Sequence, residues 1–503
     1  MERSASLAEY GVRRVFITLI AFICTLVAVM NITAANVAFN EMRGNIGASL
    51  DELSWITTAY VLAYIAIAPF CSWLSGKLGN KTYLTIALAL FVVSSFLCGN
   101  ATSITTLVVF RFLQGLGGGA MLVLSHIMIL ESWPRQRQTT AQAFFILGVL
   151  GGIKLAAPFC GYITDNYSWP YLFFANILVG ILLCILVVVF VKNRPYKQRE
   201  DWLGTIMFSI GAACLYLALV RGQEDAWLKS PFIIVLLLSG LVGLIVFIRS
   251  ELQWINPQGE NGLLRNVSLR NALIVAFVAA LCVSASSFTM VLPPRLNAHL
   301  IHISPLLVIL CITAIMALIT FLIEEKNALK YVLSAGALLL VIYNCMVYRQ
   351  PLENSTSSYI YSFLAAHILA IICLSVSVIT LVFSKLEEKE IRQGIRMYHL
   401  VMLLGLALGF ALFSASYKPP VTDQTGFSAQ LDLKDPLVQH ALKDGTRSLS
   451  EIRFLAAVNR AHDAQVGAGY VNLILFMITA AILLIGIPIV VHRMKNKAQK
   501  HKK

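Results

Sequence analysis

The sequence predicts an all-α membrane protein that crosses the bilayer many times, and three observations carry this prediction. Of the 503 residues, 58% are hydrophobic and only 13% are charged, whereas a soluble domain carries about 25% charged residues. Apolar segments of roughly 20 residues, the length that spans the hydrocarbon core, recur along the whole chain. The basic residues gather in short loops between these segments, as they do on the cytoplasmic side of membrane proteins.

Fourteen apolar segments are long enough to be transmembrane helices. An even number of spans places both tails on the same side of the membrane. Both tails are rich in Lys and Arg, so we expect both chain termini in the cytoplasm. The predicted spans cover residues 15–38, 53–74, 83–99, 104–129, 141–163, 170–191, 203–220, 230–249, 271–293, 303–323, 328–347, 358–384, 393–415 and 467–491.

The first apolar run follows Arg13 and Arg14 and has the charge pattern of a signal peptide. It continues to about Ala38, which is too long for the apolar core of a cleaved signal, so we expect a transmembrane helix. The net charge of +14 does not indicate nucleic-acid binding, because the basic residues lie at helix ends in a pattern that sets membrane topology.

The sequence contains no pattern that indicates enzymatic or metal chemistry. The ten cysteines all lie in apolar spans, where they behave as small hydrophobic residues and imply no disulfide framework. Neither a metal-ligand spacing nor a set of carboxylates or histidines at one depth is present, as a membrane enzyme would need. We therefore expect no metal, no cofactor and no enzymatic activity.

Two cationic side chains lie inside the predicted spans. Arg111 begins a run that continues through Gln114 and Gly115 to Gly119, and Lys154 lies in the following span. Ionisable groups are costly in the bilayer core and usually mark functional sites. Glycines let neighbouring helices approach closely, as a moving helix bundle requires. The residues around Lys154 that favour close packing or a bend are Gly148, Gly151, Gly152, Pro158 and Gly161.

Four motifs resemble those of the fourteen-helix drug:proton antiporters of the major facilitator superfamily. They are Met30–Ala38 in the first span, Ser72–Lys81 between the second and third spans, Arg111–Gly119 in the fourth span and Pro158–Trp169 at the end of the fifth. The motifs occur in the order and topology of that family. The resemblance covers about residues 25–195 well and the rest of the chain by topology.

The resemblance implies a major facilitator fold of two six-helix bundles with two additional helices between them. We expect the first bundle in residues 1–196, the additional helices in 197–260, and the second bundle in 261–503 with a long outer loop at 416–466. The bundles of such transporters rock around a central site. The residues to which the resemblance gives packing or gating roles are Gly76, Lys77, Gly79, Lys81, Gly115, Gly119, Gly152, Pro158, Gly161 and Asp165.

The chain departs from the family pattern at positions that matter for proton coupling. Asn31 stands where the first-span motif has an aspartate, and Gly76 stands where the loop motif has its acid. In the motif at the end of the fifth span, aligning Tyr162 with the tyrosine of the family pattern places Pro158 one position after the family proline. No Asp or Glu lies at mid-depth in a predicted span, so the carboxylates that usually carry the proton are missing.

Helical geometry places Arg111, Lys154 and Asn31 at similar depths, about 10–14 Å below the outer surface. In the family's fold their helices line the central cavity, which predicts a positively charged layer that attracts an anionic head group. Gln114 belongs to the same predicted site. Two alternatives stay open for the cations: Lys154 extends towards the outer interface, or Arg111 braces helix packing through backbone carbonyl groups. Asn31 is also compatible with a hydrogen bond between helices.

Histidine and lysine are the remaining candidates for carrying a proton. His367 lies nine residues into its span, and the reference pKa of histidine is close to neutrality. A hydrogen-bonded histidine in the core is the alternative interpretation. Lys154 is a second candidate, because a buried lysine releases its proton more readily than an exposed one. His126 and His399 lie nearer the cytoplasm and are weaker candidates.

Together these features predict a secondary active transporter of the inner membrane. It would export an amphipathic, anionic organic compound or drug by alternating access, coupled to protons. An uptake permease of the same superfamily and a degenerate membrane protein without transport activity are the alternatives. The expected partners are a small-molecule substrate, protons and the lipid bilayer, with no nucleic acid. The 416–466 loop is either a solvated cap or a docking surface for a periplasmic adaptor protein.

Overall fold

The computed structural model has the predicted all-α architecture. It describes residues 11–195, 201–222, 225, 227–253, 266–288, 305–326, 328–349, 357–384, 386 and 390–416. In these ranges, 11 helices are long and apolar enough to cross a membrane. Each predicted span from 15–38 to 393–415 overlaps helical structure in these ranges, and the 53–74 span is divided among three helical segments. The last span, 467–491, and the 416–466 loop after Ser416 lie outside the described residues.

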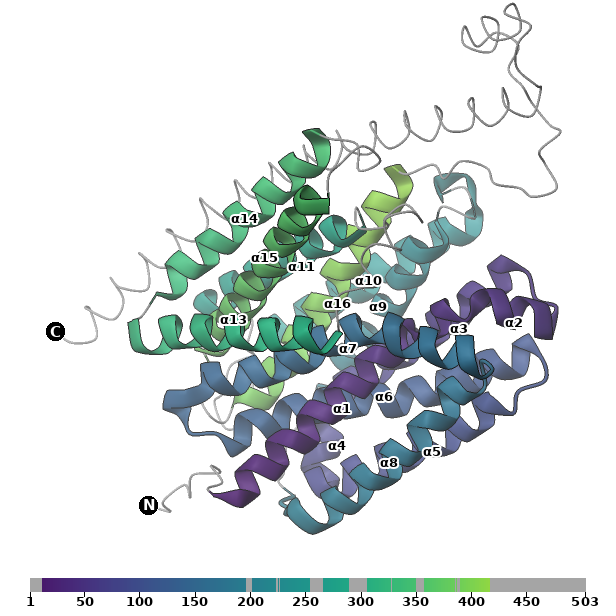
Figure 1. The fold of residues 1–503 in the computed structure, drawn as a ribbon, viewed down its shortest axis with the longest axis horizontal. Helices are drawn as coiled ribbons and strands as arrows, with labels where there is room; N and C mark the ends of the chain where they lie inside the picture. Colours follow the sequence, from purple (N-terminus) through teal and green to yellow (C-terminus); the bar gives the residue numbers. More distant parts are fainter. Residues whose placement is uncertain are drawn as a thin grey trace, which may run out of the picture.

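The first helices pack together into one group, which we call the first bundle (Figure 1). Within it, α6 contacts α1, α3 and α5, so it lies at the centre of the group, and α1 also packs along α7. The elements are α1 (Val12–Val37), α2 (Phe39–Ile46), α3 (Leu50–Ile67), η1 (Ala68–Phe70), α4 (Cys71–Leu78), α5 (Asn80–Gly99), α6 (Ile104–Ser132), η2 (Arg135–Arg137), α7 (Gln138–Asn166) and α8 (Tyr171–Phe190).

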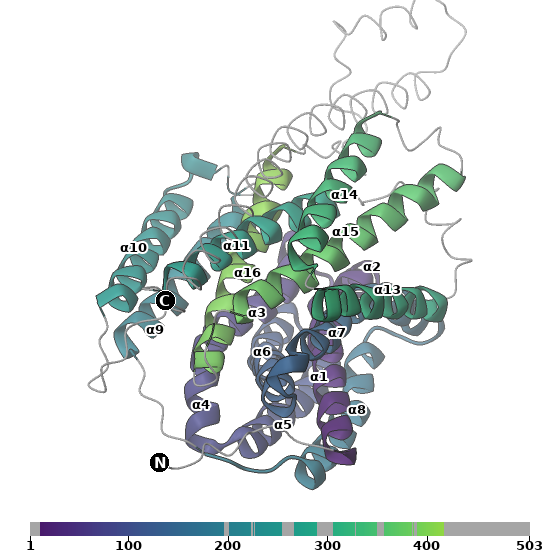
Figure 2. The ribbon, with the colours of Figure 1, turned by 90° about the vertical axis from the view of Figure 1, so that its left-hand side faces the viewer.

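The later helices form two further groups. The inserted pair, α9 (Trp202–Arg221) and α10 (Pro231–Gln253), follows the first bundle, with η3 (Trp227–Lys229) between the two helices. Figure 2 shows this pair side by side at one edge of the molecule. We call the remaining helices the second bundle: α11 (Val267–Phe288), α13 (Pro305–Lys326), α14 (Leu329–Arg349), α15 (Ser357–Phe383) and α16 (Ile391–Ser416). The predicted boundaries at 196 and 260 fall outside the described residues and stay predictions.

Contacts between the groups show how the inserted pair is held. α9 packs against α3 of the first bundle and α16 of the second. The buried side chains of Arg396 on α16 and Glu251 on α10 form an ion pair with a 3.8 Å separation. The Arg396 guanidinium also donates a 3.4 Å hydrogen bond to the hydroxyl of Thr205 on α9. The inserted helices are thus tied to the second bundle by charge as well as by apolar packing.

Local sequence signals explain where several helices begin and bend. Ser49 and Glu52 form a capping box at the start of α3, with the Ser49 hydroxyl accepting from the Glu52 N–H; such caps pair backbone groups that a helix start leaves open. Ser103 caps α6 in the same way. Pro69 lies in the short 3₁₀ segment that separates α3 from α4, as expected for a residue without an N–H donor.

The two ends of the molecule need names. We call the end where α1 begins the Val12 face and the opposite end the Val37 face; in Figure 1 the Val12 face lies to the left. The turn between α6 and α7 lies on the Val12 face, because α6 runs back towards the start of α1. The second-bundle helices α13, α15 and α16 have their Lys326, Phe383 and Ile391 ends on this face, since Glu324 and Arg392 contact the first bundle there.

Glycines allow α3 and α6 to approach closely. A Cβ atom on Gly115 would lie 2.4 Å from the Tyr60 backbone oxygen, and one on Gly119 would lie 2.8 Å from the Tyr64 Cα atom. Both obstacles are backbone atoms, which cannot move without shifting α3. The Gly115–Gly119 spacing of four residues is the one that brings membrane helices into direct backbone contact.

Candidate functional site

Arg111 lies in the interior of the first bundle and is fully buried. Its Nη2 atom donates to the Asn31 backbone oxygen at 2.8 Å, and its Nε atom donates to the Ile56 backbone oxygen at 3.3 Å. The Nη1 atom donates to the Gln114 amide oxygen at 2.7 Å. The guanidinium carbon lies 4.5 Å from the centre of the Tyr60 ring. The cation therefore joins α1, α3 and α6, which fits the bracing interpretation left open by the sequence.

The other polar residues of this region continue the same network. The Asn31 and Asn176 amides exchange two hydrogen bonds, at 3.0 Å and 2.9 Å, between α1 and α8. The Gln114 amide nitrogen donates to the Ser95 hydroxyl on α5 at 2.7 Å. Since the Asn31 and Gln114 side chains already bond to protein groups, we assign them to the brace. We call Asn31, Ser95, Arg111, Gln114 and Asn176 the brace network.

Lys154 lies apart from the brace network. It is twelve residues before the end of α7, about 18 Å along the helix axis, whereas Arg111 is seven residues from the start of α6, about 10 Å. The two helix ends are not level, however: Gly152 packs against Leu26, Val29 and Met30 of α1, which puts Lys154 near the level of Asn31. The common depth of the two cations stays a prediction, and the difference that the structure shows lies in their contacts. Lys154 is half-buried, and within the described ranges no residue forms a hydrogen bond or ion pair with its ammonium group.

The positive charge of Lys154 faces the second bundle. It lies within electrostatic range of His367 on α15, and α7 packs against α15. His367 is ten residues from the start of α15, about 15 Å, so the two groups share a depth near the middle of their helices. The structure therefore brings together two of the five predicted site residues from opposite bundles.

His367 is hydrogen-bonded on one edge and, within the described residues, buried without a partner on the other. Its exposed fraction is 1%, its ring stacks on Tyr343 with centroids 4.2 Å apart, and its Nε2 atom lies 3.1 Å from the Ser286 hydroxyl. The Tyr343 hydroxyl donates to the Ser286 backbone oxygen at 3.2 Å. Among the residues that the structure describes, nothing bonds to the His367 Nδ1 atom. One ring nitrogen is therefore buried without a hydrogen-bond partner in the described part of the chain.

Charged side chains close the two bundles against each other on the Val12 face. Arg392 on α16 forms an ion pair with Glu131 on α6, and the Asn80 amide donates to the same carboxylate at 2.9 Å. The Ser72 hydroxyl donates to the Arg392 backbone oxygen at 2.9 Å. Ser72 begins the predicted loop motif, so this motif lies at the contact between bundles.

A second ionic contact on the same face lies between α13 and the start of α7. The Glu324 carboxylate accepts from the Thr140 N–H at 2.8 Å and from the Thr140 hydroxyl at 2.9 Å. Arg137 lies 3.2 Å from Glu324 and 3.3 Å from Glu325. We call these pairs, together with Glu131–Arg392, the Val12-face latch.

The predicted gating residues occupy varied positions. Gly76 is buried in α4, Lys77 is exposed with its ammonium 5.2 Å from the Trp73 ring, and Lys81 is half-buried near the start of α5. Gly79 joins these helices with φ = 82°, a conformation that suits glycine. A Cβ on Gly152 would approach the Leu26 backbone oxygen to 2.7 Å, whereas Gly161 has open space around it. Pro158 lies within α7, and both it and Asp165 are exposed.

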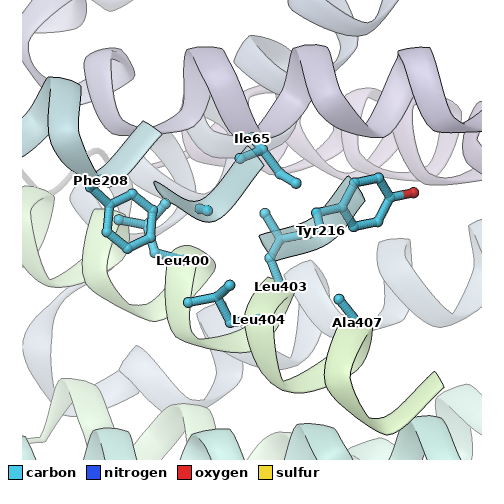
Figure 3. A pocket seen from close by; sticks show the side chains of 8 residues that line it. Ile65, Phe208, Tyr216, Leu400, Leu403, Leu404 and Ala407 are labelled. Carbon is cyan, nitrogen blue, oxygen red and sulfur yellow. The ribbon is translucent and has the colours of Figure 1, made fainter. Parts of the chain in front are cut away.

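An apolar pocket lies where α3, α9 and α16 meet (Figure 3). Its enclosed volume is about 10 Å³, the room that a single water molecule needs. Ile65 lines one side, Phe208 and Tyr216 line a second, and Leu400, Leu403 and Leu404 line the third. In this conformation the pocket is apolar and too small to hold a substrate.

The sequence indicated several of these functional residues but not the residues with which they interact. Asn176 and Ser95 were not among the predicted site residues. The pairing of Glu131 with Arg392, 261 positions away, had no trace in the local sequence. The sequence around the exposed Arg137 likewise does not indicate its ion pair with Glu324.

Comparisons with known proteins agree with this architecture. Residues 21–411 match the family model described as Major Facilitator Superfamily. The multidrug export protein EmrB of Haemophilus influenzae is 29% identical over 291 residues, which cover 57% of this chain and 56% of that protein. The fatty acid resistance protein FarB of Neisseria gonorrhoeae is 32% identical over 245 residues, 48% of each chain. The chain thus spans about half the length of the curated relatives it matches.

Solved structures show the same fold at low sequence identity. A peptide transporter, POT, superposes with a TM-score of 0.59 at 15% identity, covering 96% of this chain and 97% of that one. The human organic anion transporter TETRAN superposes with a TM-score of 0.57 at 12% identity, covering 94% of this chain and all of that one. With the family model matching most of its length, this chain belongs to the major facilitator superfamily.

Proposed function

We propose that this protein is a secondary active transporter that exports an amphipathic organic anion by alternating access. The observation that carries the proposal is the position of Lys154. A cation near mid-helix, with no counter-ion in the described part of the chain, keeps a positive potential where the two bundles meet. A buried charge without a partner is costly, so an anionic substrate would supply the missing charge.

His367 completes the proposed head-group site from the second bundle. Its free Nδ1 atom can hydrogen-bond to an anion or, after taking up a proton, pair with it. A site built from both bundles is what alternating access requires, since the ligand must contact both halves while they rock. Arg111 has no part in this proposal, because each of its three guanidinium nitrogens already donates to a protein oxygen.

Export as the direction of transport rests on the relatives. EmrB carries the name of a multidrug export protein and FarB that of a fatty acid resistance protein. A fatty acid has a carboxylate head, which the positive charge of Lys154 favours, and an apolar chain. We therefore propose that long-chain carboxylates are substrates.

The proposed setting is the inner membrane, with the Val12 face in the cytoplasm. The Lys- and Arg-rich loops support this orientation, because basic loops stay on the cytoplasmic side. The latch then closes the cytoplasmic face. Proton entry is the proposed driving force, and a periplasmic adaptor protein that binds the 416–466 segment is the proposed partner for onward export.

Transport in inside-out membrane vesicles tests the proposal. Vesicles that contain the protein should accumulate radiolabelled oleate when their lumen is acidified, and control vesicles should not. Lys154→Ala should reduce oleate uptake at least about tenfold, the effect of losing one charged contact worth about 1.5–3 kcal/mol. Uptake of the cation ethidium should fall less, because Lys154 repels it.

The matched control is Lys229→Ala, which removes an exposed lysine at the other side of the molecule. It should transport oleate like the unchanged protein at equal expression. Normal oleate transport by Lys154→Ala would contradict the proposed site. Oleate movement in the opposite direction, seen only in right-side-out vesicles, would instead identify an uptake permease.

A further inference from the structure

Two histidines from opposite bundles meet inside the molecule, between the latch and the Lys154–His367 site. His126 lies on α6 and His399 on α16, and both rings are buried. The His126 Nδ1 atom is 3.1 Å from the His399 Nε2 atom. Within the described residues, this is the only hydrogen bond between the bundles that joins two basic side chains. A histidine that only fills the core needs a hydrogen-bond partner, but that partner need not be a second histidine.

The pair is the middle of a continuous row of hydrogen bonds. The His126 Nε2 atom lies 2.8 Å from the Gln142 amide oxygen on α7, and the His399 Nδ1 atom lies 2.8 Å from the Tyr64 hydroxyl on α3. His399 is therefore held between two first-bundle residues, Tyr64 and His126. We call these four residues the histidine row. It breaks whenever α16 moves away from α3 and α6.

Protons can be counted along the row. With both rings neutral, the Gln142 oxygen accepts from His126 Nε2–H, His126 Nδ1 accepts from His399 Nε2–H, and His399 Nδ1 accepts from the Tyr64 O–H. One added proton reaches His399 Nδ1, and the ring then donates to the Tyr64 oxygen without loss of any bond. Moving the Nε2 proton of His399 to His126 Nδ1 transfers the charge to the first bundle, again with every bond kept.

A second proton is incompatible with the row. His126 Nδ1–H and His399 Nε2–H would then face each other at the 3.1 Å contact, with two donors, no acceptor and two like charges. The closed arrangement can therefore hold no proton or one proton. Once the bundles separate, each ring meets water and can bind its own proton.

In and around the histidine row, His126 and His399 are the groups that we expect to change protonation near neutral pH. His126 stacks on Phe145 with centroids 4.1 Å apart and meets the edges of Phe383 and Tyr398. The ionisable neighbours are Tyr398 on α16, which contacts both rings, and Cys71 and Tyr60, which lie within electrostatic range of Tyr64, all weak acids that stay neutral near pH 7. The nearest charges are paired: Arg392 with Glu131, and Arg396 with Glu251.

We infer that the His126–His399 pair is a proton-binding site that couples proton uptake to opening of the Val12 face. The open form binds up to two protons at these rings and the closed form at most one, so acidification on the Val12 side favours opening. The inference rests on the alternating-access part of the proposed function. It also supplies a proton carrier for a chain that lacks the usual membrane carboxylate.

Distance measurements between spin labels on the Val12 face test the inference without requiring a substrate. Labels at Gln136→Cys and Lys330→Cys report opening, because both positions are exposed and lie on different bundles. The exposed Cys311 and Cys345 are replaced by Ser in this background. For the full protein in lipid nanodiscs, the open-to-closed ratio should rise at least about fivefold, and up to ~100-fold, between pH 8 and pH 5.5, as expected for two rings with ordinary histidine pKa values.

Histidine variants test whether the pH response comes from His126 and His399. The double variant His126→Gln, His399→Gln should lose the pH response, and each single variant should show a smaller response than the unchanged protein. Arg137→Gln is the matched control, because it weakens the latch without changing a histidine. It should raise the open fraction at both pH values and keep the fold-change.

Two results would overturn the inference: a full pH response in the double variant, or its disappearance in Glu131→Gln with both histidines intact. Failure of the proposed function has a different signature. Vesicles without oleate transport, combined with a pH response that depends on His126 and His399, would remove the proposed substrate and leave the proton site.

Discussion

Arg111 illustrates how a full charge is accommodated in the core of a membrane bundle. Its guanidinium group finds no carboxylate among its described contacts and instead binds two backbone oxygens and one amide oxygen. The planar shape of the group lets it reach three acceptors on different helices while lying 4.5 Å from the Tyr60 ring centre. A lysine offers neither the fork geometry nor the flat face. The residue is therefore a structural brace whose chemistry depends on being arginine.

At the residue scale, we predict that Arg111→Lys destabilises the protein strongly. A single ammonium nitrogen does not reach acceptors on three helices, so the change breaks about two of the three guanidinium hydrogen bonds, at about 1–3 kcal/mol each. Thermal unfolding of the purified protein in detergent should show a lower midpoint, with a loss of about 2–6 kcal/mol. Lys77→Ala, which removes an exposed cation, should unfold like the unchanged protein. An unaltered midpoint for Arg111→Lys would mean that the three hydrogen bonds contribute nothing.

Helices are the scale at which the sequence was most informative. Hydropathy located each span that the structure describes, because the bilayer fixes both the length and the polarity of a crossing helix. Helix ends were less accurate: α7 continues to Asn166, three residues past the predicted span. The predicted packing role of Gly115 and Gly119 agrees with their contacts, although the sequence gave no sign that α3 is their partner.

At the element scale, Gly115 and Gly161 form a natural comparison. A methyl group on Gly115 would meet the Tyr60 backbone oxygen at 2.4 Å, whereas one on Gly161 would meet nothing within 4 Å. We predict that Gly115→Ala forces α3 and α6 apart and costs about 1–3 kcal/mol. Gly161→Ala should be neutral or slightly stabilising, because alanine favours the helix. Size-exclusion profiles and melting curves of the two variants provide the measurement, and equal behaviour would contradict close α3–α6 packing.

Contacts between bundles were beyond sequence reasoning, and they decide what the whole molecule can do. His126 and His399 are separated by 273 positions, and Glu131 and Arg392 by 261. A single sequence gives helix faces and depths, but it does not say which face of one bundle meets which face of the other. Lys154 and His367 could be selected from the sequence because they are polar residues in apolar spans. They could not be paired, because the sequence does not show which helices face each other. The fold was predictable from periodic, local properties, and the site was not, because it exists only between halves.

The Glu131–Arg392 pair offers a test at the scale of the whole molecule. Glu131→Arg places two cations together on the Val12 face, and Arg392→Glu places two carboxylates there, so each single variant should open that face. The double variant Glu131→Arg, Arg392→Glu should restore closure, because the charges are complementary again. The introduced Arg at position 131 would also meet the Asn80 Oδ1 atom, a buried acceptor without a partner in the described part of the structure.

The same pair of spin labels, at Gln136→Cys and Lys330→Cys, measures this effect at pH 8, where the histidine row is neutral. Each single reversal should raise the open-to-closed ratio about fivefold or more, since loss of a partly buried ion pair and the new repulsion together exceed about 1 kcal/mol. The double variant should return to within about twofold of the unchanged protein. If the reversed pair stayed open, closure would depend on the local shape around Glu131 and Arg392 rather than on their charges. If the single variants stayed closed, the histidine row and the Arg137–Glu324 contact alone would hold the bundles together.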